Sequence, residues 1–573
     1  MNNCKTVAEV KETSKKKEYN ITAGVLLALC ASFMLGIYAP FELYFTNMSD
    51  FWFMPKHLLL PVIVSFAAMF VAEVIVFAVA RIIHKNVYYF LLAAAFIATI
   101  ATYIQGTFLV SGIPSMDGTT YDWNQPSPER IKTIVVWAAV TAAVVFVGIK
   151  FKYTILEKAV RYISVALMVM LSVSMISIVI SSPDEDWSGE YLECTTRNMF
   201  EMSDDTNLLV FILDAVDNTT FKNAIESNPE FSNTFDDFTY YNNLLTGYLY
   251  TAEAIPFILS GDWDENDQDP ITYQNDAFSN SPLIKTLEDE EYSIGLYLCM
   301  DNKSKLKKDV FDGRIENYEA VDSVELRFTN LRDSLMVVGG MALVRYAPWD
   351  LKRVCYRLPG KIEKSKKLDS RFEYSNSVFY DQIKNNNPIE LVDRKCCRII
   401  HIEGAHVPYQ YDKNMNWIED PAQATYSDCV EGCVTMCDKL IQHLKDKGIY
   451  DNTAIVIMSD HGYDQVGYRL EGRVNPILLV KGIDEHHEMQ YSEAPISHVD
   501  CAQGFSELVQ GKPSDEIFKY RDGDERERRV LIYDHSKKQE CMSEYVTTGR
   551  ADDFEALTPT GKQYVYGEEN TAE

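Results

Sequence analysis

Asp460 and His461 stand next to each other shortly after an apolar run of the chain. That run, Thr453–Met458, is rich in β-branched and other apolar residues, which is typical of a buried strand in a parallel sheet. The strand would deliver both side chains at its C-terminal end, where open α/β sheets bind ligands. A carboxylate beside an imidazole, followed by Gly462, suits a divalent metal. A strand that merely ends in a polar loop would give the same residues.

Two further strand ends carry polar side chains. One apolar run ends at Asp214, and the run Arg398–Ile402 leads to a loop that contains His406. Each residue taken singly has an ordinary explanation, as a helix cap or as a structural histidine. Together, Asp214, Asp460 and His461 offer two carboxylates and an imidazole, a set that suits Zn²⁺ or Mn²⁺ better than Ca²⁺.

Thr251 is a candidate nucleophile, because it precedes a helix-like run. A threonine at the start of a helix is ordinarily an N-cap. The same position would also place its hydroxyl where backbone N–H groups and the positive end of the helix dipole meet an anion. A metal bound to Oγ would lower the pKa of that hydroxyl and permit a covalent mechanism.

The segments that would position these residues follow an α/β pattern from residue 207 onward. Short apolar runs alternate with amphipathic segments such as Tyr426–Lys447, which predicts a mostly parallel sheet with helices on both faces. The expected strands are Asn207–Leu213, Ser293–Leu298, Arg398–Ile402, Thr453–Met458, Pro476–Val480 and Arg529–Tyr533. Cys429, Cys433 and Cys437 share one face of the long helix. We interpret them as a stripe of small core residues rather than as a thiol metal site.

The chain before residue 182 is of a different kind. It contains five long apolar stretches, several of which reach the ~20 residues that span a bilayer as a helix. A cleaved signal peptide explains one such stretch at most. The stretches are Ile21–Phe45, Leu58–Val79, Tyr88–Val110, Ile134–Gly148 and Ile163–Ile180. We therefore expect a membrane domain of five helices over residues 20–181.

The basic residues orient these helices. Lysines crowd the N-terminal tail, residues 1–19, and basic residues are denser in the second and fourth connections than in the first and third. The positive-inside rule then places the tail in the cytoplasm and everything after Ser181 outside. We expect a linker at 182–206 and an extracytoplasmic domain over 207–573. Near helix ends on the outer side lie the aromatic residues Phe51, Trp52, Phe53, Trp123 and Trp187.

Charge and cysteine content narrow the partners and the compartment. The formal net charge of −29 lies largely in the outer part and argues against nucleic acid as a partner. An anionic substrate stays open, because a bound metal can invert the local charge. Ten of the twelve cysteines follow residue 181, where an oxidising compartment would permit up to five disulfides.

The apolar stretches, the α/β pattern and the candidate site residues occur along the chain in an order that resembles the alkaline phosphatase–sulfatase superfamily. More narrowly, they resemble its membrane-bound branch, the lipoteichoic acid synthases and lipid A phosphoethanolamine transferases. That branch has five membrane helices followed by an extracytoplasmic catalytic domain. Its Thr-Ala-x-x-x-Pro pattern around the nucleophile matches Thr251–Pro256, and its Asp-His metal pair matches Asp460 and His461. Its strand-one carboxylate matches Asp214, and its His-x-Pro element on substrate phosphate matches His406–Pro408. The resemblance implies an alkaline phosphatase-like α/β fold with Asp214, Thr251, Asp460 and His461 as metal ligands.

The sequence departs from that family in three places. Asp214 stands where glutamate is usual. A second substrate histidine is missing between the metal pair and Pro476, where Arg473 could supply positive charge instead. Thr251 lies in no Cys/Ser-x-Pro-x-Arg motif and Asp214 is followed by Ala215, so hydrolysis of sulfate esters is disfavoured. Residues 497–500 also look like the segment that follows the last core strands of sulfatases.

The resemblance implies a metal-dependent transferase in a bacterial cell membrane. Thr251 would attack the phosphorus of a phospholipid head group, of phosphoethanolamine or phosphoglycerol type, and form a phospho-threonine intermediate. His406 and Arg473 would stabilise charge on the phosphate oxygens. A hydroxyl of a glycan, teichoic acid or lipid acceptor would then take the group. Two alternatives stay open: a phosphodiesterase or a sulfate or phosphate ester hydrolase of the same superfamily, and an inactive envelope scaffold.

Overall fold

The computed structural model describes most of the 573-residue chain and divides it into two compact units. The described residues are 21–48, 55–110, 123, 127–182, 191–231, 233–298, 308–311, 313–321, 331–356, 371–418, 423–462, 473–533 and 541–565. The helical unit contains Met1–Met116, Tyr121–Glu185 and Arg327–Lys366. The sheet unit contains Asp186–Leu326 and Lys367–Glu573.

The helical unit contains five spans that are long and apolar enough to cross a membrane. Only 11% of the span Pro55–Ile83 and 6% of the span Pro128–Phe151 is buried within their most apolar windows. Apolar side chains such as Leu59 and Ile82 are exposed there, which lipid accommodates and water does not. The elements are α1 (Thr22–Phe33), the π-helix η1 (Met34–Tyr38), α2 (Ala39–Thr46), α3 (Pro55–Ile83), α4 (Lys85–Phe108) and α5 (Pro128–Ser181). The prediction of five apolar N-terminal helices is confirmed.

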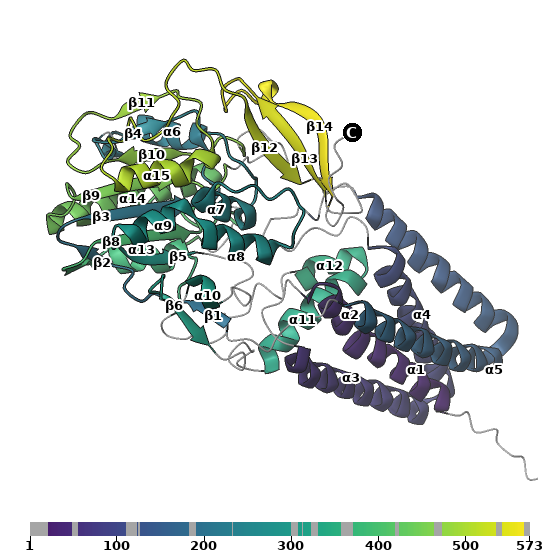
Figure 1. The fold of residues 1–573 in the computed structure, drawn as a ribbon. Coiled ribbons are helices and arrows are strands. Elements are labelled where there is room, and N and C mark those ends of the chain that lie inside the picture. Colours follow the sequence, from purple (N-terminus) through teal and green to yellow (C-terminus); the bar gives the residue numbers. More distant parts are fainter. Residues whose placement is uncertain are drawn as a thin grey trace, which may run out of the picture. The chain divides into compact units, whose positions relative to one another are not determined.

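Two of the five spans lie in α5, and the contacts of α5 show that the chain reverses within it. A straight helix of its 54 residues would be about 80 Å long. Thr133, near its start, donates to Gln105 in the last turn of α4 at 3.1 Å, and Ser182, at its end, donates to the carbonyl of Phe45 in the last turn of α2 at 3.3 Å. In the middle, Tyr153 stacks on Tyr89, near the start of α4, with ring centroids 4.0 Å apart. The two ends of α5 therefore lie at one end of the bundle and its middle lies at the other (Figure 1).

The helical unit also contains α11 (Leu331–Tyr346) and α12 (Trp349–Tyr356), which come from the middle of the sheet unit's sequence. α11 and α12 thus pack with the helical unit, although they lie within residues 207–573 of the sequence. The later part of α11 packs against α2, α3 and α4, and Ala342 and Tyr346 are buried in one apolar cluster with Met34 and Leu171. Of the five expected interfacial aromatic residues, only Trp123 lies within the described residues.

A seven-stranded sheet forms the core of the sheet unit (Figure 1). Its order is β11-β4-β10-β9-β3-β8-β5, and every pairing is parallel except those of β10 with its two neighbours. The strands are β3 (Asn207–Leu213), β4 (Thr239–Tyr241), β5 (Ser293–Tyr297), β8 (Cys396–Ile402), β9 (Thr453–Met458), β10 (Leu478–Lys481) and β11 (Gln490–Ser492). The predicted mostly parallel sheet is confirmed, and β3 and β9 have the bounds expected from their apolar runs.

Helices cover both faces of this sheet, as the α/β pattern predicts. One apolar core lies between the sheet and α6 (Asn218–Ser227), α13 (Asn376–Ile383) and α14 (Tyr426–Lys447). A second core on the other face includes α7 (Thr251–Ser260), α8 (Pro270–Asn280), α9 (Pro282–Asp289), α10 (Lys308–Phe311) and α15 (Cys501–Val509). The strands that carry the candidate site residues are thus buried on both faces and held rigidly.

Smaller sheets lie apart from the main sheet. The expected strand at Arg529–Tyr533 exists, but it pairs in a separate antiparallel sheet made of β12 (Arg528–Tyr533), β13 (Cys541–Thr547) and β14 (Thr558–Val565). Most side chains of β14, an edge strand of this sheet, are exposed. Two-stranded pairs join β1 (Tyr191–Cys194) to β6 (Tyr318–Val321) and β2 (Glu201–Ser203) to β7 (Glu390–Val392).

The long predicted helix has its expected bounds as α14. A capping box of Thr425 and Asp428 begins it, and Gly448 in the left-handed region ends it. Its three cysteines, at most 2% exposed, pack into the core, so their interpretation as a core stripe is confirmed. All cysteines in the described part of the chain are free, and Cys299 lies outside it. None of the nine described cysteines beyond residue 181 therefore forms one of the disulfides that the composition would permit.

Candidate active site

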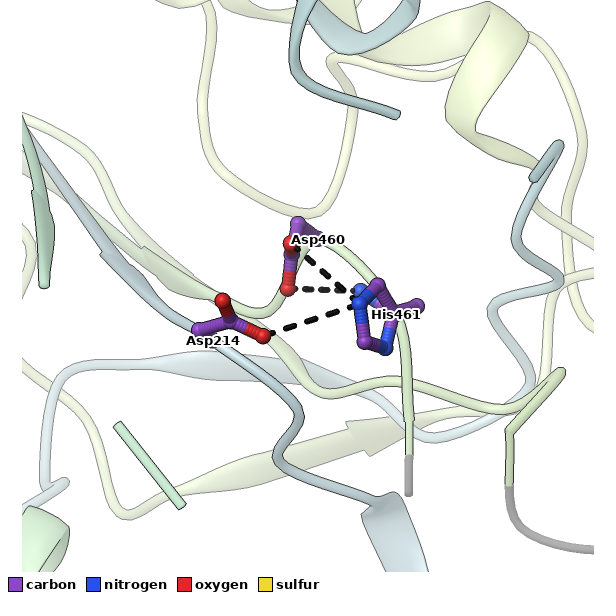
Figure 2. Close-up of side chains that lie close together, drawn as sticks. All are labelled: Asp214, Asp460 and His461. Atoms are coloured by element: carbon purple, nitrogen blue, oxygen red, sulfur yellow. Dashed lines mark hydrogen bonds and ion pairs between the residues drawn. The ribbon is translucent and has the colours of Figure 1, made fainter. Parts of the chain in front are cut away.

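β3 and β9 end side by side and bring three predicted site residues together. The two strands are parallel neighbours, with Ile212 opposite Met458. Asp214 follows β3, and Asp460 and His461 follow β9, so the three side chains converge beyond one edge of the sheet (Figure 2). His461 Nε2 lies 3.6 Å from Asp214 Oδ1 and 3.6 Å from Asp460 Oδ2. All three residues are buried.

The cluster of Asp214, Asp460 and His461 fits a divalent metal ion. One possible ligand atom from each residue lies within 4.8 Å of the others. Asp214 Oδ1 and Asp460 Oδ2 are buried and accept no hydrogen bond within the described part of the chain. A buried carboxylate oxygen without a donor is unfavourable unless a cation faces it. Two carboxylates and an imidazole are also ligands that Zn²⁺ and Mn²⁺ accept.

The two carboxylates respond differently to their burial. Burial, and after it the charge of Asp460, raises the pKa of Asp214 to about 8. Burial alone would also raise the pKa of Asp460, but His461, His401 and the hydroxyl of Thr251 outweigh it and hold that pKa below its ordinary value. Two carboxylates that share a buried site commonly separate in this way. A bound cation would remove their repulsion and keep both ionised.

Thr251 is the first residue of α7 and does not cap it. The N-cap is Tyr250, whose side chain makes no capping hydrogen bond. Thr251 Oγ1 donates instead to Asp214 Oδ2 at 3.2 Å. The hydroxyl therefore lies beside the carboxylate cluster, at the helix end where backbone N–H groups and the helix dipole favour an anion.

Pro256 explains how this short helix is supported. Proline has no N–H, so the carbonyl of Ala252, four residues earlier, lacks its usual helical partner. Gln274 of α8 donates to that carbonyl at 3.4 Å, and Gly261, with φ +77°, ends the helix. The Thr-Ala-x-x-x-Pro pattern thus corresponds to a helix whose first turn presents Thr251.

The loop after β8 lies against Asp214, although His406 does not join the cluster. Ala405 N donates to the carbonyl of Asp214 at 2.8 Å. His406 is half-buried, with Nδ1 2.6 Å from the carbonyl of Val407. Within the described residues, no hydrogen bond or ion pair links its ring to Asp214, Asp460 or His461. Its predicted contact with substrate phosphate stays a prediction.

Arg473 lies near Thr251. Its carbonyl accepts from Gly462 N at 2.9 Å, which ties it to the end of β9. Its guanidinium carbon lies 5.4 Å from the ring centroid of Tyr250, the residue before Thr251. A fixed positive charge therefore stands beside the predicted nucleophile, where an anionic substrate would benefit from it.

Sequence reasoning missed two side chains at the cluster. Tyr374 donates its hydroxyl to Asp214 Oδ2. His401 of β8 is fully buried, with Nε2 3.8 Å from Oδ2 of both aspartates. A lone histidine inside an apolar strand was a signal for His401, whereas nothing in the sequence singles out Tyr374.

Residues 497–500 form a helix cap, which places another histidine in the interior. Ser497 and Asp500 form a capping box around the 3₁₀-helix η8 (His498–Asp500). His498 is fully buried, with Nδ1 3.1 Å from Thr246 Oγ1. Burial lowers its pKa to about 3, which keeps the imidazole neutral.

The fold and this arrangement of residues define an enzyme site at the edge of an α/β sheet. Residues 206–511 match the Sulfatase family, and the chain belongs to that family. The resemblance to the alkaline phosphatase–sulfatase superfamily is confirmed, and the chain is an enzyme of that superfamily. No curated protein matches the chain.

Several solved structures are similar to this chain at low identity. Lipooligosaccharide phosphoethanolamine transferase A from Neisseria meningitidis, an integral membrane protein, is 12% identical, with 85% of this chain and 95% of that chain covered at a TM-score of 0.31. A lipoteichoic acid synthase from Listeria monocytogenes is 12% identical, with 64% and 86% covered at 0.34. A phosphonate monoester hydrolase from Silicibacter pomeroyi is 13% identical, with 62% and 88% covered at 0.33.

Proposed function

We propose that this chain transfers the phosphoryl head group of a membrane phospholipid to a cell-envelope hydroxyl through a phospho-threonine intermediate on Thr251. The observation that carries the proposal is the hydrogen bond from Thr251 Oγ1 to Asp214 Oδ2, in a cluster with the properties of a metal site. A hydroxyl so placed can act as a nucleophile when a neighbouring group favours loss of its proton. The five apolar spans in the same chain supply the second argument, because they would hold the site at a lipid surface.

In the first half-reaction, Thr251 Oγ attacks the phosphorus of the donor lipid. The bond from Thr251 Oγ to phosphorus forms, and the bond from phosphorus to the glycerol oxygen of diacylglycerol breaks. The threonine proton leaves toward Asp214, its hydrogen-bond acceptor, and the departing glycerol oxygen gains a proton from solvent. A metal held by Asp214, Asp460 and His461 would supply positive charge beside the hydroxyl and the phosphate.

Two groups of the chain would bind the phosphate oxygens. The backbone N–H groups in the first turn of α7 and the dipole of that helix favour an anion at Thr251. Arg473, stacked on Tyr250, adds a fixed positive charge. In the second half-reaction, an acceptor hydroxyl attacks phosphorus, its proton goes to solvent, and the bond to Thr251 Oγ breaks. The group is then transferred and Thr251 regains its proton.

The test is a comparison of wild type, Thr251→Ala and Thr251→Ser in detergent–phospholipid micelles loaded with Zn²⁺ or Mn²⁺. The probes are phosphatidylethanolamine and phosphatidylglycerol with labelled head groups, and release of diacylglycerol reports the first half-reaction. We expect Thr251→Ala to lose at least ~10³-fold in rate, because the nucleophile is removed, and Thr251→Ser to retain part of the activity. Mass spectrometry of wild type should find an adduct on Thr251 whose mass names the transferred group.

Thr272→Ala is the matched control, because it removes a half-buried threonine from the first turn of the neighbouring helix α8. It should act like wild type. Release of the free head-group phosphate in equal amounts with and without an acceptor would identify a hydrolase instead. Undiminished diacylglycerol release by Thr251→Ala would refute the threonine mechanism, and a wild-type protein that binds neither metal would indicate an inactive scaffold.

A further inference from the structure

The two oxygens of the Asp214 carboxylate have different surroundings. Oδ2 accepts hydrogen bonds from the hydroxyls of Thr251, at 3.2 Å, and Tyr374. Oδ1 accepts no hydrogen bond within the described residues and lies 3.6 Å from His461 Nε2. Since a carboxylate oxygen that accepts two hydroxyls has little left to offer a cation, Oδ1 is the oxygen available to a metal.

Tyr374 is supported on both sides along its own segment. Before it, Phe372 N donates to the carbonyl of Cys194 at 2.9 Å, and the buried ring of Phe372 lies 5.9 Å from that of Tyr297. After it, the buried side chain of Asn376 donates to the carbonyl of Gly404 at 2.6 Å and accepts from Gly404 N at 2.9 Å. The phenol is therefore delivered to Asp214 by a backbone that is fixed at both ends.

The ring of Tyr374 also packs within the site. Its centroid lies 5.0 Å from that of His401, whose Nε2 faces Oδ2 of Asp214 at 3.8 Å. This contact restricts rotation of the phenol, so its hydroxyl keeps its direction toward the carboxylate. A hydrogen bond from a rigid donor fixes the rotation of an acceptor more strongly than one from a flexible side chain does.

We propose that Tyr374 is a positioning residue of the metal site: its hydroxyl holds Asp214 Oδ2 so that Oδ1 is presented to the metal and Oδ2 to Thr251. The inference rests on the proposed metal-dependent function and assigns a residue that its motifs do not contain. Without the phenol, the carboxylate can rotate and exchange its oxygens. Metal binding must then select the correct rotamer from several, which weakens the apparent affinity.

The test is equilibrium titration of the full-length protein in detergent with Zn²⁺ and with Mn²⁺, against a chromophoric chelator, for wild type and Tyr374→Phe. We expect the metal affinity of Tyr374→Phe to fall by about 10- to 100-fold, the usual effect of removing a group that orients a metal ligand. The metal concentration for half-maximal diacylglycerol release should rise by the same factor. Activity at saturating metal should return to within a fewfold of wild type, which a phenol acting directly in the chemistry would not allow.

Tyr380→Phe is the matched control, since it removes one phenol hydroxyl from the adjacent helix α13, and the described residues give that hydroxyl no bond to the cluster. It should bind metal like wild type. Metal affinity of Tyr374→Phe within twofold of wild type would overturn the inference, as would an equal loss in Tyr380→Phe. Wild type that binds neither metal would overturn the proposed function itself. A lower melting temperature of metal-free Tyr374→Phe with unchanged metal affinity would assign the residue a purely structural role.

Discussion

Asp214 is fixed through its backbone as well as through its carboxylate. Its N–H donates to the carbonyl of Ile402 at 3.1 Å, and its carbonyl accepts from Ala405. The N–H of the next residue, Ala215, donates to Asp460 Oδ1 at 3.2 Å. The position of the Asp214 carboxylate therefore depends on the loop that follows β8, a strand that is remote from Asp214 in the sequence.

Gly404 in that loop gives a direct test at the residue scale. Its φ is +57°, and a Cβ there would lie 2.3 Å from the carbonyl oxygen of Asp214. We expect Gly404→Ala to push Asp214 away, to lower the free energy of unfolding by more than ~2 kcal/mol and to weaken metal binding by at least ~10-fold. Thermal unfolding and chelator titration of the full-length protein would measure both.

A control at Gly448 separates the steric effect of a Cβ at residue 404 from the backbone strain of a positive φ. Gly448 also has a positive φ, +71°, but a Cβ there would meet nothing within 4 Å. Gly448→Ala should cost about 1 kcal/mol, the usual penalty for a left-handed residue with a side chain, and leave metal affinity unchanged. If both variants behaved alike, the contact between Gly404 and Asp214 would have no special importance.

At the scale of elements, α11 is joined to the membrane helices by polar groups as well as by packing. Arg345 lies 3.2 Å from Glu42 of α2 and donates to the carbonyl of Gly106 in α4 at 2.9 Å. Tyr346, 1% exposed, donates its hydroxyl to the other oxygen of Glu42 at 2.5 Å. These bonds satisfy the carboxylate within an apolar bundle, where an unpaired charge would be unfavourable.

α4 and α11 approach each other closely at Gly106, so we expect a side chain added at this position to disturb their packing. A Cβ at Gly106 would lie 2.3 Å from the ring of Tyr346, whereas a Cβ at Gly148 in α5 would meet nothing within 4 Å. We expect Gly106→Val to displace Tyr346 and to lower the melting temperature of the protein in detergent micelles by several degrees, through about 1–3 kcal/mol of overpacking. Gly148→Val should change it little. Equal melting temperatures for the two variants would contradict the docking of α11.

At the scale of the whole molecule, the helical unit predicts the side of the membrane on which each part lies. Five crossings, with α5 supplying two, would leave the N-terminal tail and the sheet unit on opposite sides. Basic residues near the turn within α5 would then face the cytoplasm. Exposed Glu525 of the sheet unit and exposed Lys158 of α5 should therefore differ in accessibility.

A membrane-impermeant maleimide tests this orientation in intact cells. Glu525→Cys should be labelled without permeabilisation, and Lys158→Cys should be labelled only after it. The unsubstituted protein is the control, because the described native cysteines are buried except for the half-buried Cys355. If only Lys158→Cys were labelled in intact cells, the protein would have the opposite orientation in the membrane.

The sequence by itself determined the elements whose burial can be inferred from their own residues. β3 and β9 are buried on both faces, so each reads as a continuous apolar run with clear ends. The amphipathic period of α14 and the lengths of the five apolar spans are equally local. The strand ends, and with them Asp214, Asp460 and His461, followed from these runs, because parallel strands deliver their C-terminal residues to one edge.

The tertiary structure alone decided what depends on partners far along the chain. Tyr374 meets Asp214 across 160 residues, and no local pattern records such a contact. Local composition also does not show that α11 packs with the membrane helices or that β12 pairs outside the main sheet. In both cases several possible partners have a similar apolar character. The two interpretations of Thr251 differ only in where its hydroxyl points, and that direction is set by the packing of α7 beside β3.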